Sequence, residues 1–523
     1  MYFILNFYIC IVEIIYCEIL IIFIMNNTFN SQKISVTEKI GYGLGDCSAN
    51  LVFQMMMIYQ TKFYTDVFGL EGAIAGTVML VARIVDAFVD PAVGILSDRT
   101  NTKWGKYRPW VLWTALPFMV FYVLAFYNPG IEDKGLVALY ATISYTLLMT
   151  MYSFNNTPYA SLGGVMSSDI KERTSITSVR FIFSTIAQFV VQGLTLPLVS
   201  KFSAGGDKSY GWLCTVSIFA LVGFIFLIVV FFSAKERITP PSGQKNDTRQ
   251  DIKDIFHSVP WKSMFVLTLF VFITLAMWGS AMNYYFENYV DRTALYEFLG
   301  DLGLVSANVN DSIGYIILNA FGLVVSSPEN AYEVGFGVFN MLSALVQFLG
   351  VIFLSERLAN KYGKKRTFIV CLSLTAIFTA AFYFPSNDSI GTIFVLNVLK
   401  SLAYAPTVPL LWAMIADVAD HSEYVHYRRA TGFVFAGIVF ALKAGLGMGG
   451  AILGFILSGF GYASGAGIEQ SESAIHGILL SSSLIPAVTF AVGVIALLYY
   501  PISKNFNEKM QAELAERRMK KDY

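Results

Sequence analysis

The sequence predicts an all-α integral membrane protein with about twelve spanning helices in two six-helix halves. Of the 523 residues, 55% are hydrophobic and only 14% are charged, whereas soluble domains carry about 25% charged residues. Apolar blocks long enough to cross a bilayer recur along the whole chain, and a charged stretch interrupts them near the middle. Only helices satisfy their own backbone hydrogen bonds over so many separate apolar segments.

The apolar blocks define the expected spans. In the first half we expect them at 44–67, 72–97, 109–128, 136–163, 174–200 and 209–233. In the second half we expect them at 263–287, 336–356, 366–384, 388–416, 432–460 and 476–501. The charged segment 234–262 contains Pro240 and Pro241 and is expected to be a central loop, so that the halves are 38–233 and 263–505.

Lysine and arginine are unevenly shared between the connecting loops. The loops after the second, fourth, sixth and eighth spans and the tail 506–523 are rich in both, whereas the opposite side holds only Lys134, Lys201, Lys208 and Arg292. Basic residues concentrate in cytoplasmic loops. The bias predicts that both chain ends, the central loop and the tail are cytoplasmic.

Two further segments stand apart from the spans. The extension 1–37 begins with an apolar stretch, 1–24, that lacks the features of a signal peptide. It is either an extra helix or a misplaced start, and we favour translation from Met25. The acidic insertion 288–335 contains an apolar piece too short to span. We expect an external helical cap that filters substrate or, as we slightly favour, covers helix ends.

Two short basic loops occupy equivalent positions in the halves. Asp98, Arg99 and Lys106 lie in the loop after the second span, and 355–366 follows the eighth. Each loop has a glycine before its final cations. Positive-inside charge explains one such loop, but two equivalent copies favour parallel repeats, the architecture of the major facilitator superfamily.

Asp86 and Asp90 lie four residues apart inside the second span, on the same helix face as Arg83. Ionised groups at membrane depth cost several kcal/mol unless they are paired, hydrated or bound to an ion. Two carboxylates this close do not both stay ionised cheaply, so either one keeps a proton or a small cation such as Na⁺ lies between them. Either arrangement would act as a coupling site.

Arg180 and Lys443 are basic residues at membrane depth, one in each half. Long donors facing a wet cavity suit hydroxyl-rich or carboxylate-bearing substrates. The alternative is a buried ion pair with Asp86 or Asp90. Lys400, in the tenth span, is left without an assigned role.

Uncharged polar residues and one further ion pair complete the membrane-depth candidates. Asn50, Gln54, Asn156 and Tyr159 would add polar groups to a cavity, although any one of them is more often a helix–helix hydrogen bond. Lys62 and Asp66 are expected to form an ion pair at the membrane interface.

Several segments carry a family resemblance. They are 39–46, 64–70, 82–91, 104–110 and 416–424 followed by Arg429. The Arg83–Asp86–Asp90–Pro91 block is the specific part. Over 38–505, excepting the insertion, the chain resembles the glycoside–pentoside–hexuronide:cation symporters.

The resemblance implies roles for individual residues. Asp86, Asp90 and Asn156 match cation-coupling positions, Arg180 matches a sugar-site arginine and Lys443 an important lysine. The matching loops, with expected gating roles, contribute Asp98, Arg99, Lys106, Asp417, Asp420, Glu423 and Arg429. The best-known member, the melibiose permease, has sugar-contacting aspartates where this chain has Asn50 and Asn156. Their absence argues against melibiose-type recognition and leaves the choice between Na⁺ and H⁺ open. A uronic acid would be better tolerated, although neutral xylosides or other glycosides are equally reasonable.

We therefore expect a symporter of the bacterial inner membrane that moves a glycoside, pentoside or hexuronide with Na⁺ or H⁺ by alternating access. It would work as a monomer and without a cofactor, and the zero net charge gives no reason to expect nucleic acid as a partner. An enzyme is disfavoured, because no nucleophile–base or metal pattern appears. The alternatives are a lysolipid or amphiphile symporter of the same fold and a membrane sugar receptor that does not transport.

Overall fold

The computed structural model describes residues 34–167, 170–203, 206–237, 256–306, 313–426, 431–465 and 468–520. Within these ranges the regular elements are helices, joined by turns and two isolated β-bridges. Residues 1–24, most of the predicted central loop and Arg429 lie outside the described residues.

The first half contains six spanning segments in chain order. The first is α2 (Val36–Ile58), which continues through α3 (Gln60–Lys62) and the π-helix η2 (Phe63–Val67). The others are α4 (Gly72–Arg99), α5 (Arg108–Ala125), α6 (Lys134–Val165), α7 (Ile170–Phe202) and α8 (Lys208–Ser233).

The second half repeats this number of segments. They are α10 (Val259–Asn288), α13 (Ala331–Tyr362), α14 (Lys364–Ala381), α15 (Ile390–Tyr404) with α16 (Thr407–His426), α17 (Thr431–Gly459), and α18 (Glu472–Ser482) with α19 (Leu484–Leu498). Pro406 and Pro486 lie at the two breaks, where a missing N–H interrupts the helical ladder.

Ten helices among the described residues are long and apolar enough to cross a membrane. The remaining two predicted spans correspond to α2, which contains several polar residues, and α14, which begins with three cations. The predicted all-helical membrane fold with about twelve spans is thus confirmed. Most observed ends lie within a few residues of the predicted ones, but α2 begins eight residues before the predicted start at 44 and α16 ends ten residues after the predicted end at 416.

Polar side chains fix where several helices begin. Ser35, Asp133 and Asp207 each accept a backbone N–H from the first turn of the helix that follows. The same cap occurs at Ser258, Asp291 and Ser471 in the second half. Such caps satisfy N–H groups that have no partner inside the helix, and they set where each polar loop gives way to a span.

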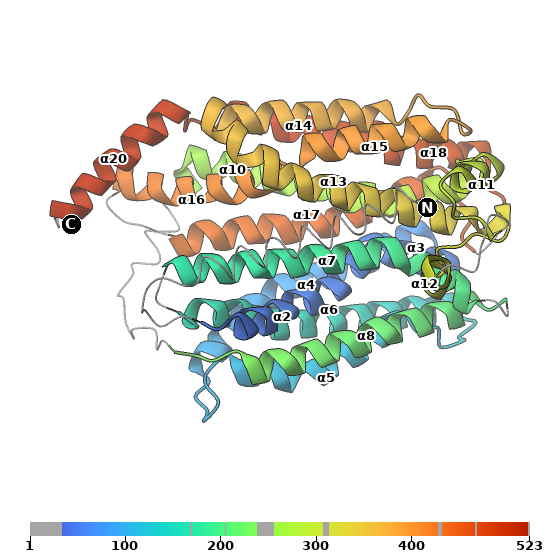
Figure 1. Ribbon diagram of the computed structural model, residues 1–523, viewed down its shortest axis with the longest axis horizontal. Coiled ribbons are helices and arrows are strands. Elements are labelled where there is room, and N and C mark those ends of the chain that lie inside the picture. The colour runs from blue at the N-terminus through green and yellow to red at the C-terminus, as the bar shows by residue number, and fades with distance from the viewer. Residues whose placement is uncertain are drawn as a thin grey trace.

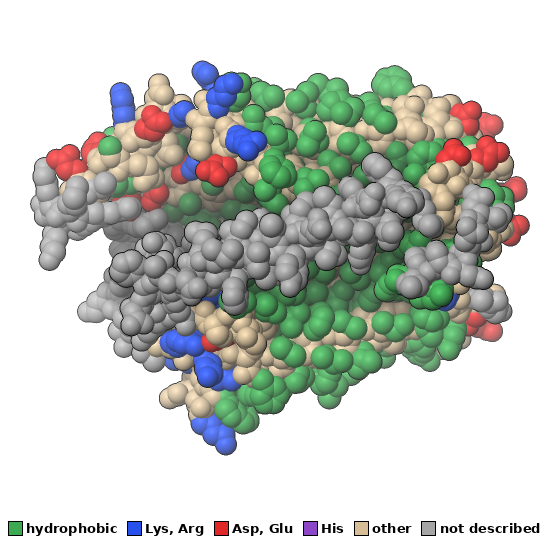
Figure 2. Space-filling model, in the orientation of Figure 1, with side chains coloured by type: hydrophobic (Ala, Val, Ile, Leu, Met, Phe, Trp, Pro, Cys, Tyr) green, Lys and Arg blue, Asp and Glu red, His purple; other side chains and the backbone are tan. Residues whose placement is uncertain are grey.

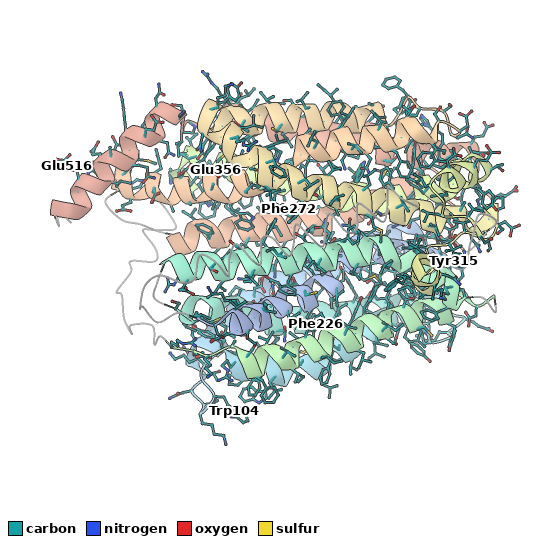
Figure 3. All side chains as sticks on the ribbon, viewed as in Figure 1. Trp104, Phe226, Phe272, Tyr315, Glu356 and Glu516 are labelled. Atoms are coloured by element: carbon teal, nitrogen blue, oxygen red, sulfur yellow. The ribbon has the colours of Figure 1, made fainter. Side chains whose placement is uncertain are left out.

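The two halves lie side by side, the earlier helices below the later ones in Figure 1. We call the end that carries α20 (Lys504–Lys520) the tail end, and the end that carries α11 (Arg292–Asp301) and α12 (Ile313–Ala320) the cap end. Lysine and arginine side chains gather at the tail end, acidic ones predominate at the cap end, and hydrophobic ones cover the surface between (Figure 2). Trp104 and Tyr315 mark the two ends in Figure 3.

The insertion 288–335 contains two short helices and lies at the cap end. An isolated parallel bridge between Val305 and Val325 closes it on itself. Lys201, at the end of α7 in the other half, donates hydrogen bonds to the carbonyls of Asn319 and Ala320 at 2.6 and 3.0 Å. These carbonyls end α12, where a cation is favourable. The insertion therefore contacts both halves.

Glycines bring the two halves into backbone contact along α4 and α17. A Cβ at Gly72 would lie 2.6 Å from the carbonyl oxygen of Gly454, and one at Gly76 would lie 2.9 Å from backbone atoms of Ala451. Small residues at this spacing allow membrane helices to approach closely. The seam runs from the middle of the molecule toward the cap end.

Replacing Gly76 with alanine is therefore expected to force the seam apart. Overpacking of this kind costs about 1–3 kcal/mol, so the apparent melting temperature of the purified protein in detergent should fall. Gly94→Ala is the matched control on the same helix, because a Cβ at Gly94 would meet no described atom within 4 Å. Equal melting temperatures for the two variants would contradict the close contact.

Candidate substrate and cation site

Asp86 and Asp90 lie one turn apart on α4, where this helix contacts α6 and α17. Asp86 is completely buried, and Ser153 of α6 donates a hydrogen bond to its Oδ1 at 2.5 Å. The Asp90 side chain keeps 25% of its exposure. One carboxylate is therefore enclosed by protein and the other is partly exposed.

Lys443 of α17 reaches these carboxylates from the other half. Its Nζ lies 3.0 Å from Oδ2 of Asp86, donates a hydrogen bond to Asp90 and lies 3.5 Å from the hydroxyl of Ser153. The ammonium thus occupies the place where we expected a proton or a small cation. The ion pair considered for Lys443 in the sequence is the arrangement that the structure has.

Arg83 lies one turn before Asp86 and is 7% exposed. Its aliphatic stem packs so closely on Gly447 that a Cβ there would lie 2.6 Å from Cγ of Arg83. Gly447 of α17 therefore makes room for the Arg83 stem where α4 crosses α17. A second cation thus lies one turn along α4 from Asp86.

Arg180 does not pair with Asp86 or Asp90. Its Nε and Nη2 donate to the two carboxylate oxygens of Asp46 at 2.6 and 3.1 Å, a bidentate geometry. The guanidinium lies over the rings of Tyr42 and Tyr159, 5.6 and 5.1 Å from their centroids. The expected alternative partner for Arg180 was wrong, because the carboxylate comes from α2.

Asp46 was missed as a site residue because the first span was expected to begin at 44. The helix begins at Val36, so Asp46 lies about three turns inside it. One sequence signal was available: Asp46, Asn50 and Gln54 repeat every four residues and so share a face of α2.

The uncharged candidates have different surroundings. Asn50 donates to the backbone carbonyl of Asp46 at 2.9 Å, and Gln54 is buried and accepts from Gln192 at 3.0 Å. Asn156 contacts the hydroxyl of Tyr152 at 3.5 Å. Tyr159 is 1% exposed and donates to the carbonyl of Tyr42. Tyr159 is therefore fixed in position and presents its ring face to the Arg180 guanidinium.

The charged groups in the middle of the molecule keep part of their exposure. The side chains of Arg180, Asp46 and Lys443 are 25%, 16% and 17% exposed. Tyr152 lies within electrostatic range of Asp46 and of the Asp86–Asp90 pair. Tyr152 therefore lies within range of both charge clusters.

Comparison with known proteins identifies the family. The profile of the MFS/sugar transport protein family matches residues 41–318 and 320–504. The chain belongs to this family. It is 33% identical over 490 residues to the inner membrane symporter YicJ of Escherichia coli (strain K12), covering 93% of this chain and 96% of that one. It is 30% identical to the isoprimeverose transporter of Lactiplantibacillus pentosus, covering 94% of each.

Solved structures support the fold. A structure that concerns substrate recognition in proton dependent oligopeptide transporters superposes with a TM-score of 0.61 at 12% identity, covering 91% of this chain and 99% of that one. At such low identity the likeness concerns the fold alone. Together with the family match, it places this chain among the multi-pass membrane transporters of the major facilitator superfamily rather than among enzymes.

In this transporter the first basic loop is held at the tail end by a residue that the sequence did not single out. Glu236 accepts the backbone N–H groups of Lys106, Tyr107 and Arg108 at 2.9, 2.7 and 3.0 Å, at the start of α5. A carboxylate is favourable at a helix amino terminus. Tyr107 donates to Asp98 at 2.7 Å, and burial followed by this carboxylate raises its pKa well above the usual range.

The second group of predicted gating residues holds the tail helix. Both oxygens of Asp417 lie 2.8 Å from Nζ of Lys364, and Asp420 accepts from Gln511 of α20 at 2.8 Å. Glu423 is 3% exposed on the same helix. These contacts of Asp417 and Asp420, like that of Asp98 with Tyr107, stay within one half and its tail.

Lys62 and Asp66 form the ion pair that we expected, at 2.8 Å, but the pair is buried rather than interfacial. Both side chains are under 10% exposed, and Nζ of Lys62 also pairs with Glu287 of α10. Tyr462 donates to Asp66 at 3.2 Å. The expected exposure was wrong because Glu287, at the end of α10, brings a second partner from the other half. This network links the two halves toward the cap end.

Replacing Lys443 with methionine is expected to leave Asp86 and Asp90 without their resident ammonium. Because an opposite charge at this distance typically changes proton binding tenfold or more, half-maximal activation by Na⁺ or H⁺ should occur at an about tenfold lower cation concentration. Cation-dependence of uptake into proteoliposomes measures this. Lys103→Met, at an exposed loop lysine, is the control, and an unchanged activation curve for the Lys443 variant would rule out competition for the carboxylates.

Proposed function

We propose that this transporter couples the movement of a glycoside to that of Na⁺ or H⁺ through the contact between Lys443 and the Asp86–Asp90 pair. One observation supports this most directly. The carboxylates belong to the first half and the ammonium to the second, so the charge pair connects the two bodies that move in alternating access.

A coupling cation and Lys443 compete for the same carboxylates. A proton or Na⁺ bound at Asp86 and Asp90 removes the negative charge that attracts Lys443, and the attraction between the halves weakens. An ion binding to one site thereby shifts the population of the two states of the transporter. Solvent reaches Asp90, which is one-quarter exposed, and gives the cation an entry route.

The conformation described is one of these two states. The polar contacts between the halves toward the cap end include Thr65 with Tyr284 at 2.8 Å and Asn283 with the carbonyl of Ile58 at 2.8 Å. Together with the Lys62–Glu287 pair they seal this end. We assign the tail end to the cytoplasm, since it carries most of the basic side chains (Figure 2). The state is then closed on the side opposite the cytoplasm.

The sugar is placed beside Arg180 and Asp46. Their pair offers N–H donors and carboxylate acceptors about as far apart as neighbouring sugar hydroxyls, and Asn50 lies one turn further along α2. Ring faces of Tyr42 and Tyr159 hold the guanidinium in place. The relative named as an isoprimeverose transporter supports a glycoside as substrate.

Asp86→Asn and Asp90→Asn are expected to abolish accumulation. Without the titrating or ion-binding carboxylate the cation gradient no longer biases the two states, so the internal-to-external ratio of substrate should approach about one. Uptake of a labelled glycoside into proteoliposomes under imposed Na⁺ or H⁺ gradients measures the ratio. Counterflow, which needs substrate binding but no gradient, should continue.

Asp133→Asn is the matched control, because Asp133 caps α6 and asparagine caps a helix equally well. Normal accumulation by both site variants would refute the coupling role of the pair. Absence of counterflow in the unsubstituted protein, for every glycoside that binds, would instead show a receptor that does not transport.

A further inference from the structure

Lys400 lies in α15, inside the second half, and is 7% exposed. Its Nζ lies 2.9 Å from the centroid of the Trp278 ring of α10. Within the described part of the chain, no carboxylate pairs with this ammonium. Sequence patterns assigned it no role, and neither the cation site nor the Arg180–Asp46 pair uses it.

Three other cations between the helices pair with carboxylates. Arg180 has Asp46, Lys443 has Asp86 and Asp90, and Lys62 has Asp66 and Glu287. Lys400 has an aromatic face instead. A cation over a desolvated ring is stabilised by it, but by less than a lysine loses when it is buried at membrane depth. The ring therefore offsets only part of the cost.

Unsatisfied polar atoms lie on the helices around this ammonium. Nε1 of Trp278, Nδ2 of Asn340 and Oδ1 of Asn397 are buried and have no hydrogen-bond partner among the described residues. Buried polar atoms are paired in the great majority of cases. Several unpaired polar atoms on the helices around a cation that has no carboxylate partner among the described residues indicate a ligand-binding site.

Contacts between α13 and α15 bring these residues to the same place. Asn397, one turn before Lys400, donates its amide to the carbonyl of Phe339, the residue before Asn340, at 2.8 Å. One turn further along both helices, the hydroxyls of Ser343 and Ser401 lie 2.6 Å apart. We refer to Trp278, Asn340, Asn397 and Lys400 as the Lys400 cluster.

The helix that carries Trp278 also contacts the first half. Ser280 of α10 donates to the carbonyl of Met57 in α2 at 2.7 Å. Trp278, Asn340 and Lys400 keep 7–8% exposure, whereas Asn397 has none. Asn397 is thus the most enclosed member of the Lys400 cluster.

We propose that the Lys400 cluster is an oxyanion subsite that holds the carboxylate or sulfonate of an acidic glycoside during transport. The ammonium, the indole N–H and the Asn340 amide are three donors, which matches a group that only accepts hydrogen bonds. A negatively charged group also supplies the counter-charge that Lys400 lacks among the described residues. The inference rests on the proposed transport function and specifies its substrate class.

A matched pair of ligands tests the proposal. 4-Nitrophenyl β-glucuronide and 4-nitrophenyl β-glucoside differ in a carboxylate against a hydroxymethyl group on the same ring. Binding of each to the purified full-length protein is measured by quenching of tryptophan fluorescence, and uptake is measured in proteoliposomes with a cation gradient. The unsubstituted protein should bind the glucuronide at least about tenfold more tightly, as expected for an ion pair formed out of water.

Lys400→Met keeps the length of the apolar stem and removes the charge. It should lose the preference, with glucuronide affinity falling about tenfold or more and glucoside affinity unchanged. Its melting temperature should not fall, because an unpaired buried charge is removed. Lys361→Met is the control in the same half, since Lys361 is exposed and lies over the ring of Tyr362 at 5.1 Å. It should retain the preference.

Other outcomes separate the possibilities. Equal preference in Lys400→Met and the unsubstituted protein, or tighter binding of the glucoside by the latter, would overturn the subsite. Inorganic phosphate or chloride could instead stabilise the unsubstituted protein but not Lys400→Met. If this occurs without a preference for the glucuronide, it would refute the proposal that the bound anion belongs to the substrate. Gradient-driven uptake of the glucoside alone would leave the transport function standing and the subsite refuted, whereas tight glucuronide binding without uptake or counterflow would contradict transport.

Discussion

The ion pair between Lys443 and the two carboxylates of α4 is the contact on which the arrangement of the halves depends. It places opposite charges in different bodies of one chain. The approach of α4 to α17 that allows it requires glycine at Gly72, Gly76 and Gly454, where larger residues would strike backbone. Electrostatic attraction and close backbone packing therefore act on the same pair of helices.

Two charge networks link the halves, and they differ in their contact with water. The Lys443 network includes Asp90, whose side chain is 25% exposed. The Lys62 network at the cap end is nearly dry. Separating a buried ion pair leaves uncompensated charges inside the protein, which is costly. A partly exposed pair can instead exchange its partner for an ion from solution. The Lys443 network is suited to responding to a coupling ion, and the Lys62 network is suited to keeping the cap end closed.

Much of the fold followed from the sequence, because apolar length and loop charge determine spans in a bilayer. The cation site was recognised for a similar reason, since Asp86 and Asp90 are costly at membrane depth and therefore conspicuous. Asp46, Ser153 and Glu236 were not recognised. Ser153 is an ordinary residue until α6 brings it to Asp86, and Glu236 is a loop acid until it meets three N–H groups of α5. Such roles depend on which helices pack together, which single-sequence patterns do not specify.

The insertion at the cap end belongs to the second half in the sequence, but it also contacts the first half. Gly322 packs against the backbone of Pro197 in α7, next to the α12 carbonyls bound by Lys201, and Val325 is paired with Val305 beside α11. Only about three residues separate these anchors, and an extended chain covers about 3.3 Å per residue. The insertion is thus a tether with roughly 10 Å of reach. Separation of the halves by more than this at the cap end must detach one anchor, so a short chain length limits how far that end opens.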